Sequence, residues 1–208
     1  MSGADPRSFW DQRFDQEDYL FGKEPNAFLV SQAPLLRPGQ RALSVADGEG
    51  RNSVWLALEG LDVTAVELSA PAIAKARRLA DERGVNVGFH QADLLDWDFG
   101  QGRYDVIAAI FIQFLAPVER EVVFQRMAAA LRPGGWLILQ GYTPKQLEYR
   151  TGGPPCAENL YTSDLLMGAF AGLEIMHLWE HEAHVVEGTG HVGWSALIDL
   201  VARRPAEG

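Results

Sequence analysis

The sequence predicts an α/β fold with a mostly parallel sheet, helices on both faces and a closing antiparallel hairpin. Between residues 41 and 142, short β-rich runs alternate with helical stretches, which is typical of a parallel sheet covered by helices. Further on, the extended runs 172–186 and 191–204 are separated by EGTG, and a Gly-containing connection of this length indicates a hairpin. The length of 208 residues suits one large domain, so we expect a single domain over 1–208.

The order of the elements follows from apolar patterning and from residues that begin or end helices. Ser69 is suited to cap the helix after it, Pro71 fits the first turn of that helix, and Gly84 ends it. The segment RPGG ends a later helix before the next strand. Besides the hairpin we expect strands at 41–46, 62–68, 86–92, 104–111 and 136–142, and helices at 51–60, 70–84, 117–131 and 162–170.

Composition and charge narrow the classes of partner. The chain has 18 basic against 28 acidic residues, and its net charge is −10. Nucleic-acid binding depends on clustered Lys and Arg, so we expect a small-molecule partner and no nucleic acid. No stretch approaches the roughly 18 apolar residues of a membrane helix, so we expect no membrane partner. The lone cysteine, Cys156, excludes an internal disulfide and indicates the cytoplasm, while the oligomeric state stays open.

The segment SVADGEGRNSVWLA at 44–57 joins a predicted strand to a predicted helix. A strand, a Gly-x-Gly turn and a helix N-terminus place backbone N–H groups beside a bound ligand. Gly48 and Gly50 fit this arrangement, although two glycines also suit a tight turn without a ligand. Glu67 ends the second strand, where an acid can hold ribose hydroxyls, and Asp93 follows the third, where a carboxylate can accept from an adenine amino group. Each acid alone also fits a solvated strand end, but three such features at successive strand ends favour a cofactor site.

The motifs ALSVADGEGRN, VTAVELS, FHQADLLDWDF, YDVIAAIF and LRPGGWLIL occur in this order over residues 41–141. Together they resemble the class I S-adenosylmethionine (SAM) dependent methyltransferases, whose Rossmann-like, seven-stranded sheet also ends in a hairpin. The segments DYLFGKEPNAFL, GEGRN and YTPKQLEYRTGGPP are most similar to the tellurite-resistance and thiopurine methyltransferase branch. The resemblance implies a SAM-dependent methyltransferase that acts on a small-molecule nucleophile, with a thiol or other chalcogen as the acceptor in this branch.

The resemblance also implies roles for individual residues. The loop Ala46 to Gly50 would wrap the methionine part of SAM, Glu67 would bind its ribose, and Asp93 would contact its adenine. The full set of expected cofactor-binding residues is Tyr19, Lys23, Ala46, Asp47, Gly48, Gly50, Arg51, Glu67, Leu68, Asp93, Leu94 and Ile110.

The family pattern has an acid in the first strand followed by three alternating glycines, and this chain departs from it at two positions. Ser44 stands at the acid position and Ala46 at the first glycine, while Gly48 and Gly50 are retained. Asp47 either replaces the missing charge and faces the SAM ammonium, or accepts hydrogen bonds from its own turn.

Two further segments are expected to close the site. Residues 1–32 would form a helical lid, from which Tyr19 or Lys23 reaches the SAM carboxylate unless Arg51 does so. Residues 143–170 would form a loop and helix on the acceptor side. The acceptor pocket is expected to be partly apolar and to include Phe21, Phe111, Gln113, Tyr142, Tyr149 and Arg150.

No catalytic residue is assigned from the sequence, and no metal is expected. A thiol or selenol is partly ionised near neutral pH and needs no strong base. An oxygen or nitrogen acceptor would more often need one, and the candidates are the late histidines His177, His181 and His184.

Two other functions stay open. An NAD(P)-binding Rossmann oxidoreductase would prefer a glycine at the position of Ser53 and would need residues for hydride transfer. A non-catalytic SAM-binding regulator would share the motifs of the enzymes, and only turnover with a small nucleophile would separate the two.

Overall fold

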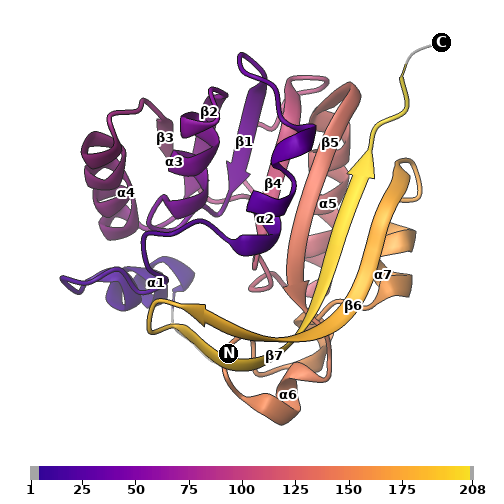
Figure 1. Ribbon diagram of the computed structural model, residues 1–208. Coiled ribbons are helices and arrows are strands. Elements are labelled where there is room, and N and C mark those ends of the chain that lie inside the picture. Colours follow the sequence, from indigo (N-terminus) through magenta and orange to yellow (C-terminus); the bar gives the residue numbers. More distant parts are fainter. Residues whose placement is uncertain (1–4, 207–208) are drawn as a thin grey trace.

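A computed structural model describes residues 5–206, so both ends of the expected domain 1–208 and the start of the expected lid lie outside the described residues. The seven-stranded sheet has the order β3-β2-β1-β4-β5-β7-β6 (Figure 1). Strand β7 runs antiparallel between β5 and the edge strand β6, and the predicted fold class is confirmed. The strands are β1 (Arg41–Val45), β2 (Asp62–Glu67), β3 (Gly88–Gln91), β4 (Tyr104–Ile110), β5 (Leu131–Tyr142), β6 (Glu174–Glu187) and β7 (His191–Arg203).

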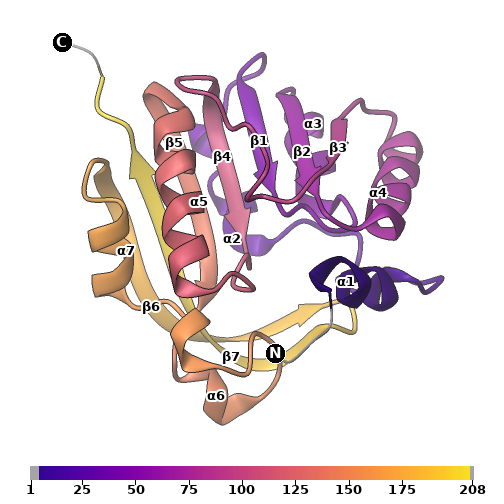
Figure 2. The same cartoon turned by 180° about the vertical axis from the view of Figure 1, so that it is seen from behind.

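Helices cover both faces of the sheet. Figures 1 and 2 show α2 and α3 on one face and α5 and α7 on the other. Side chains alternate along β4: Val106 packs with Leu56 of α3, whereas Ile107 packs with Phe124 of α5. The helices are α1 (Pro6–Phe14), α2 (Ala27–Ser31), α3 (Arg51–Leu58), α4 (Ala70–Arg83), α5 (Pro117–Ala130), α6 (Gln146–Tyr149) and α7 (Ser163–Ala169), with 3₁₀ turns at Ala33–Leu35 and Ala157–Asn159.

The helix boundaries agree with the capping residues that the sequence offers. The Oγ of Ser69 accepts a hydrogen bond from N of Ala72, and Gly84 ends α4 in the left-handed conformation. Thr162 caps α7 in the same way, through N of Leu165. Strand β5 begins earlier than expected, at Leu131, because Leu131 already pairs with Tyr104 of β4, and the RPGG segment forms an irregularity before the pairing resumes at Trp136.

The β6–β7 hairpin extends beyond the rest of the sheet, because β7 pairs with β5 only from Leu197 to Arg203. In Figure 1 its distal half curves beneath the carboxyl ends of the parallel strands and reaches the segment that follows α1. There the backbone N atoms of Thr189 and Gly190 both donate to the Leu20 carbonyl at 2.9 Å. At Gly188, a Cβ atom would lie 2.3 Å from the same carbonyl oxygen, so only glycine fits this contact. The hairpin and the N-terminal segment therefore enclose the edge of the sheet at which the predicted site lies.

Replacing Gly50 by Ala should lower the free energy of unfolding by about 2–4 kcal/mol, from left-handed backbone strain and overpacking together. Gly50 has a φ of 90°, and an added Cβ would meet Cβ of Ala76 at 2.7 Å. Gly84→Ala is the matched control, since Gly84 has a φ of 69° with nothing near its Cβ position. This variant should lose only the backbone part, about 1–2 kcal/mol. Urea unfolding measures both, and equal losses would contradict the packing argument.

Candidate functional site

The loop between β1 and α3 turns through three left-handed residues. Ala46, Gly48 and Gly50 have φ values of 49°, 62° and 90°. A non-glycine residue at positive φ is strained, and such strain concentrates at ligand sites. The loop therefore has the tight shape that the Gly-x-Gly pattern predicts, and Ala46 takes a backbone conformation that favours glycine.

Asp47 holds the first turn of α3. Its carboxylate accepts hydrogen bonds from Oγ of Ser44 at 2.7 Å and from both N and Oγ of Ser53. Because Gly50 at the N-cap has no side chain, Asp47 supplies the acceptor that the first turn needs. Burial raises the pKa of Asp47, and these hydrogen bonds oppose that shift. These contacts are those of an acid bonded to its own turn, while a contact with the SAM ammonium stays a prediction.

The two predicted acids lie at the ends of β2 and β3. The buried carboxylate of Glu67 accepts from N of Gly48 at 2.9 Å and from N of Ser69 at 2.8 Å, so it lies directly against the glycine loop. Burial raises the pKa of Glu67, while the backbone donors lower it. Asp93 accepts from N of Leu95 at 2.9 Å, in a turn that buries the side chain of Leu94.

Arg51, the first residue of α3, forms a buried ion pair with the hairpin. Its Nη2 lies 2.7 Å from Oε2 of Glu187, and its Nη1 is buried with no hydrogen-bond partner within residues 5–206. Glu187 faces His191 across the hairpin, and Nδ1 of His191 lies 3.2 Å from the same Oε2. Arg51 is thus held by a carboxylate on one side and has a free donor on the other.

The pKa shifts of Glu187 and His191 give the two side chains different protonation states. Burial acts to raise the pKa of Glu187, but the hydrogen bond from His191 and the charge of Arg51 outweigh it and lower the pKa to about 2. Burial lowers the pKa of His191, although Glu187 opposes this shift. At neutral pH the carboxylate is therefore ionised and the imidazole is neutral.

An aromatic cluster of Phe21, Phe111, Tyr142 and His191 lies beside the ion pair. Ring centroids are 4.5 Å apart for Phe21 and His191, 4.9 Å for Phe111 and His191, and 4.6 Å for Phe111 and Tyr142. Phe111, directly after β4, has a left-handed φ of 56°. The Tyr142 hydroxyl is buried without a partner in the described part of the chain, and burial raises its pKa. Three residues expected at the acceptor pocket thus come together, and His191 joins them from the hairpin.

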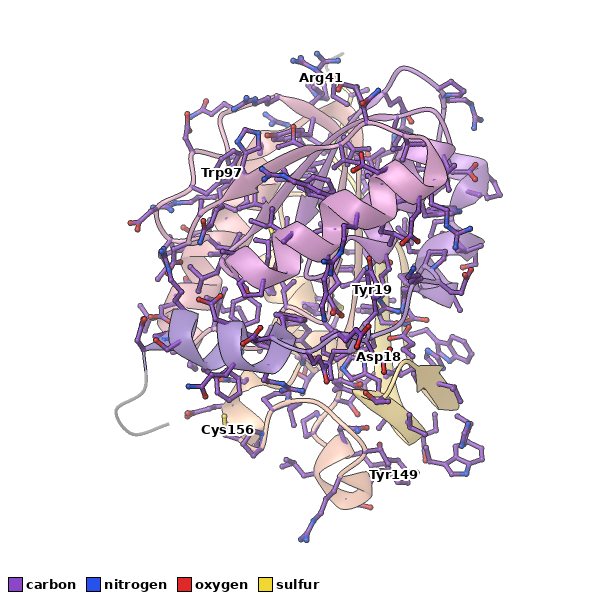
Figure 3. All side chains as sticks on the ribbon, turned by 90° about the vertical axis from the view of Figure 1, so that its left-hand side faces the viewer. Asp18, Tyr19, Arg41, Trp97, Tyr149 and Cys156 are labelled. Atoms are coloured by element: carbon purple, nitrogen blue, oxygen red, sulfur yellow. The ribbon has the colours of Figure 1, made fainter. Side chains whose placement is uncertain are left out.

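Tyr19 and Lys23 lie against α4 in this structure rather than toward the glycine loop. The Tyr19 hydroxyl donates to the Lys75 carbonyl at 2.9 Å, and Lys23 pairs with Glu82 at 2.6 Å. Figure 3 shows Tyr19 beside this helix. The exposed acid of α4 attracts Lys23, so of the three basic or phenolic candidates for the SAM carboxylate only Arg51 lies beside the loop.

Of the remaining acceptor-side residues, Gln113 is buried and Tyr149 is half-buried. Gln113 accepts from N of Tyr142 at 2.6 Å and donates to its carbonyl at 2.8 Å, so it holds the end of β5. Tyr149 lies at the lower edge of the molecule in Figure 3, where its hydroxyl bonds the carboxylate of Glu182, and Arg150 is exposed.

The loop after α6 reaches the aromatic cluster through glycines. Cβ atoms at Gly152 and Gly153 would lie 3.1 Å and 2.7 Å from the Tyr142 side chain. Tyr149 and Arg150 do not join the cluster, because the exposed acid of β6 binds Tyr149 and the chain turns outward at Arg150, whose φ is 56°.

A buried polar network extends from the ion pair into the sheet. Asn26 donates through Nδ2 to Oε1 of Glu187 at 2.9 Å and to Gln140 at 2.7 Å. Gln140 donates to Asp199 at 2.6 Å, and His181 lies 2.9 Å from the same carboxylate. The sequence analysis missed this network because its members come from β5, β6, β7 and the start of α2.

A second buried ion pair ties the N-terminal segment to the loop. Lys75 of α4 lies 2.8 Å from Oε1 of Glu49, and both side chains are almost fully buried. Lys75 also donates to the Asp18 carbonyl at 2.6 Å, and N of Phe21 donates to Glu49 at 3.2 Å. Glu49 stands between the two glycines of the loop, and this position was the only signal in the sequence that it served the site.

Known proteins are similar to this chain in sequence and in fold. Residues 42–135 match the family described as a methyltransferase domain. Over 112 residues the chain is 31% identical to a demethylmenaquinone methyltransferase of Thermus thermophilus, a match that covers 53% of this chain and 50% of the relative. The chain thus spans about half the length of the curated relatives it matches.

Two solved structures superimpose over almost the whole chain. One, described for the conversion of a disulfide bond into a thioacetal group during echinomycin biosynthesis, has a TM-score of 0.76 at 22% identity and covers 97% of this chain and 93% of its own. The other is the N-methyltransferase NodS of Bradyrhizobium japonicum with S-adenosyl-L-homocysteine, with a TM-score of 0.74 at 12% identity and coverages of 96% and 98%. The fold is therefore the Rossmann-like methyltransferase fold. The match to the methyltransferase-domain family supports SAM as the cofactor. Among the described residues, no helix is long and apolar enough to span a membrane.

Replacing Glu187 by Gln should destabilise the protein by about 3–5 kcal/mol near pH 7, because Arg51 would keep a buried charge without a counter-ion. The pKa of Glu187 is lowered from its ordinary value of 4.5 to about 2 in the fold. Its contribution is therefore complete above pH 4.5 and is lost as the pH falls through about 2. Urea unfolding of both proteins between about pH 7 and pH 3 should show a constant difference at first, narrowing below pH 4.5. An equal difference at every pH would mean that the ionised carboxylate is not the stabilising group.

Proposed function

We propose that this chain, a class I SAM-dependent methyltransferase by its domain match and its fold, methylates a small protic molecule, with a thiol or other chalcogen as the acceptor. The observation that carries the proposal is the buried, unpartnered Nη1 of Arg51 at the start of α3, beside the Gly48–Gly50 loop. A buried guanidinium donor without an acceptor is costly, and a ligand carboxylate would satisfy it. SAM has such a carboxylate. The proposal takes the whole chain as one domain that works in the cytoplasm.

The residues of the loop fit SAM in charge and in hydrogen bonding. Arg51 would hold the carboxylate, the Ala46–Gly50 backbone would surround the methionine part, and Glu67 would exchange its bond from Gly48 for the ribose hydroxyls. In this structure the Phe14 ring lies against the loop, 3.7 Å from the Cβ position of Gly48. Binding would therefore shift the α1 segment, which makes the lid a moving part.

SAM supplies a methyl group that is already activated on a sulfonium, so this chain's residues would mainly align the reactants and exclude water, an effect worth roughly 7–11 kcal/mol. The aromatic cluster and the hairpin tip are suited to both tasks. Gly190 lies against the Phe21 ring, and Gly152 and Gly153 lie against the Tyr142 side chain, so backbone closes over the cluster at these glycines.

Four observations favour a neutral acceptor with a soft nucleophile. The aromatic cluster is apolar, and the net charge of −10 disfavours anionic substrates and nucleic acid. The sequence resembles the tellurite-resistance and thiopurine branch. A structural relative is described for sulfur chemistry, the conversion of a disulfide into a thioacetal. The demethylmenaquinone methyltransferase relative supports a second candidate, an aromatic ring system.

Glu67→Ala should weaken the binding of S-adenosylhomocysteine by a free energy on the order of 2–4 kcal/mol, through loss of charge-assisted hydrogen bonds to ribose. Asp62→Ala is the matched control, since Asp62 is an exposed acid at the opposite end of β2. Calorimetry should show unchanged affinity for the control. A wild-type protein that is stabilised by NADH and not by S-adenosylhomocysteine would instead favour an oxidoreductase.

A panel of thiols, selenols, phenols and amines, assayed for release of S-adenosylhomocysteine, tests the acceptor class. We expect turnover with thiols or selenols, unchanged by a chelator. Turnover confined to phenols or amines would contradict the chalcogen acceptor. Tight binding without turnover of any acceptor would favour a SAM-binding regulator.

A further inference from the structure

We propose that His191 is the general base of this methyltransferase and removes the proton from a neutral acceptor, while Glu187 positions it. This inference rests on the proposed function and names the residue that the sequence analysis left unassigned. The late histidines His177, His181 and His184 are poorer candidates. His181 is bound to Asp199, His177 packs on Phe28, and His184 is exposed beside Trp194.

His191 lies beside the position that an acceptor would occupy. It is the first residue of β7, it is buried, and its ring contacts Phe21 and Phe111 within the aromatic cluster. Phe111 directly follows β4, and ligands of open α/β sheets bind outside the carboxyl ends of the strands. Through Glu187 and Arg51 the imidazole is also joined to the first turn of α3, beside the glycine loop.

The hydrogen bonds around His191 fix its orientation and its tautomer. Its Nδ1 faces the ionised carboxylate of Glu187, which holds a proton on Nδ1 and leaves the lone pair on Nε2. Within residues 5–206 the ring makes its hydrogen bond through Nδ1 and none through Nε2. Arg51 binds Oε2 of Glu187 and Asn26 binds Oε1, so the carboxylate is held at both oxygens. A base with one nitrogen anchored and the other free is the arrangement that proton abstraction requires.

The charge states agree with this role. The titratable and charged groups that face His191 are Glu187 on β6, Arg51 on α3, Tyr142 on β5 and Arg13 on α1. Burial, Arg51 and Arg13 lower the pKa of His191, and Glu187 acts in the opposite direction. The imidazole is therefore unprotonated and able to accept a proton near neutral pH.

The apolar cluster explains why even a thiol would need a base here. Removal from water disfavours the charged form, so the pKa of a thiol rises when it enters an apolar pocket. In the step we propose, Nε2 takes the proton of the acceptor while the acceptor's lone pair bonds to the methyl carbon. The methyl–sulfur bond breaks and its electron pair stays on sulfur, which gives S-adenosylhomocysteine. The imidazolium then returns the proton to water.

His191→Gln tests the proposal against His184→Gln as the control. We expect His191→Gln to lower kcat for a neutral acceptor about 10²- to 10⁴-fold near pH 7, with the affinity for S-adenosylhomocysteine nearly unchanged. The lost rate should return as the pH approaches the acceptor's own pKa. Glu187→Gln should reduce kcat less and shift the acidic limb of the pH profile. His184→Gln should match the wild type.

Each result separates this inference from the proposed function. Wild-type turnover that persists unchanged in His191→Gln overturns the base and leaves the methyltransferase intact, whereas a wild type that neither binds S-adenosylhomocysteine nor turns over overturns both. If His191→Gln does not fold, the acidic limb of kcat/KM is measured for wild type with a series of arylthiols. A limb that stays fixed across the series supports a base on the enzyme, and a limb that follows the acceptor pKa overturns it.

Discussion

The buried ion pair between Arg51 and Glu187 is the interaction on which the site depends. Arg51 begins the helix after the glycine loop, and Glu187 ends β6 at the far end of the chain. The pair holds the hairpin tip against the carboxyl edge of the parallel strands. It is the direct ion pair between the hairpin and the first turn of α3, and it lies where β7 no longer pairs with β5.

The buried carboxylate of this pair is stable because neighbouring groups donate hydrogen bonds to both of its oxygens. Removal from water costs each ion several kcal/mol, and a carboxylate in the interior repays this only with further hydrogen bonds. Glu187 has donors at both oxygens, from Arg51, His191 and Asn26. The donor of Arg51 that stays without a partner is therefore the exception, and such an exception in a closed network points to a ligand.

The N-terminal segment is fixed by the same kind of contact. Lys75 and Glu49 form an ion pair that is almost fully buried. Lys75 also binds the backbone of Asp18, and Glu49 binds the backbone of Phe21. Leu20, between them, accepts two hydrogen bonds from the hairpin tip. The N-terminal segment, the glycine loop and the hairpin are therefore one connected unit.

The sequence by itself determined the fold and half of the site. The signals for the fold are local in the sequence: period-two and helical apolar patterns, the caps at Ser69 and Gly84, and the Gly-containing hairpin connection. Such signals can be recognised without knowledge of the tertiary structure. For the same reason Gly48, Gly50 and Glu67 could be placed at one sheet edge, since parallel strands end together.

The partners of Tyr19, Lys23 and Tyr149 depend on which groups lie nearby in space, and sequence spacing does not carry that information. Glu187 and His191 read as ordinary hairpin residues in the sequence. Only the curvature of the hairpin, which carries them beneath the carboxyl ends of the parallel strands, buries them beside Arg51 and the aromatic cluster.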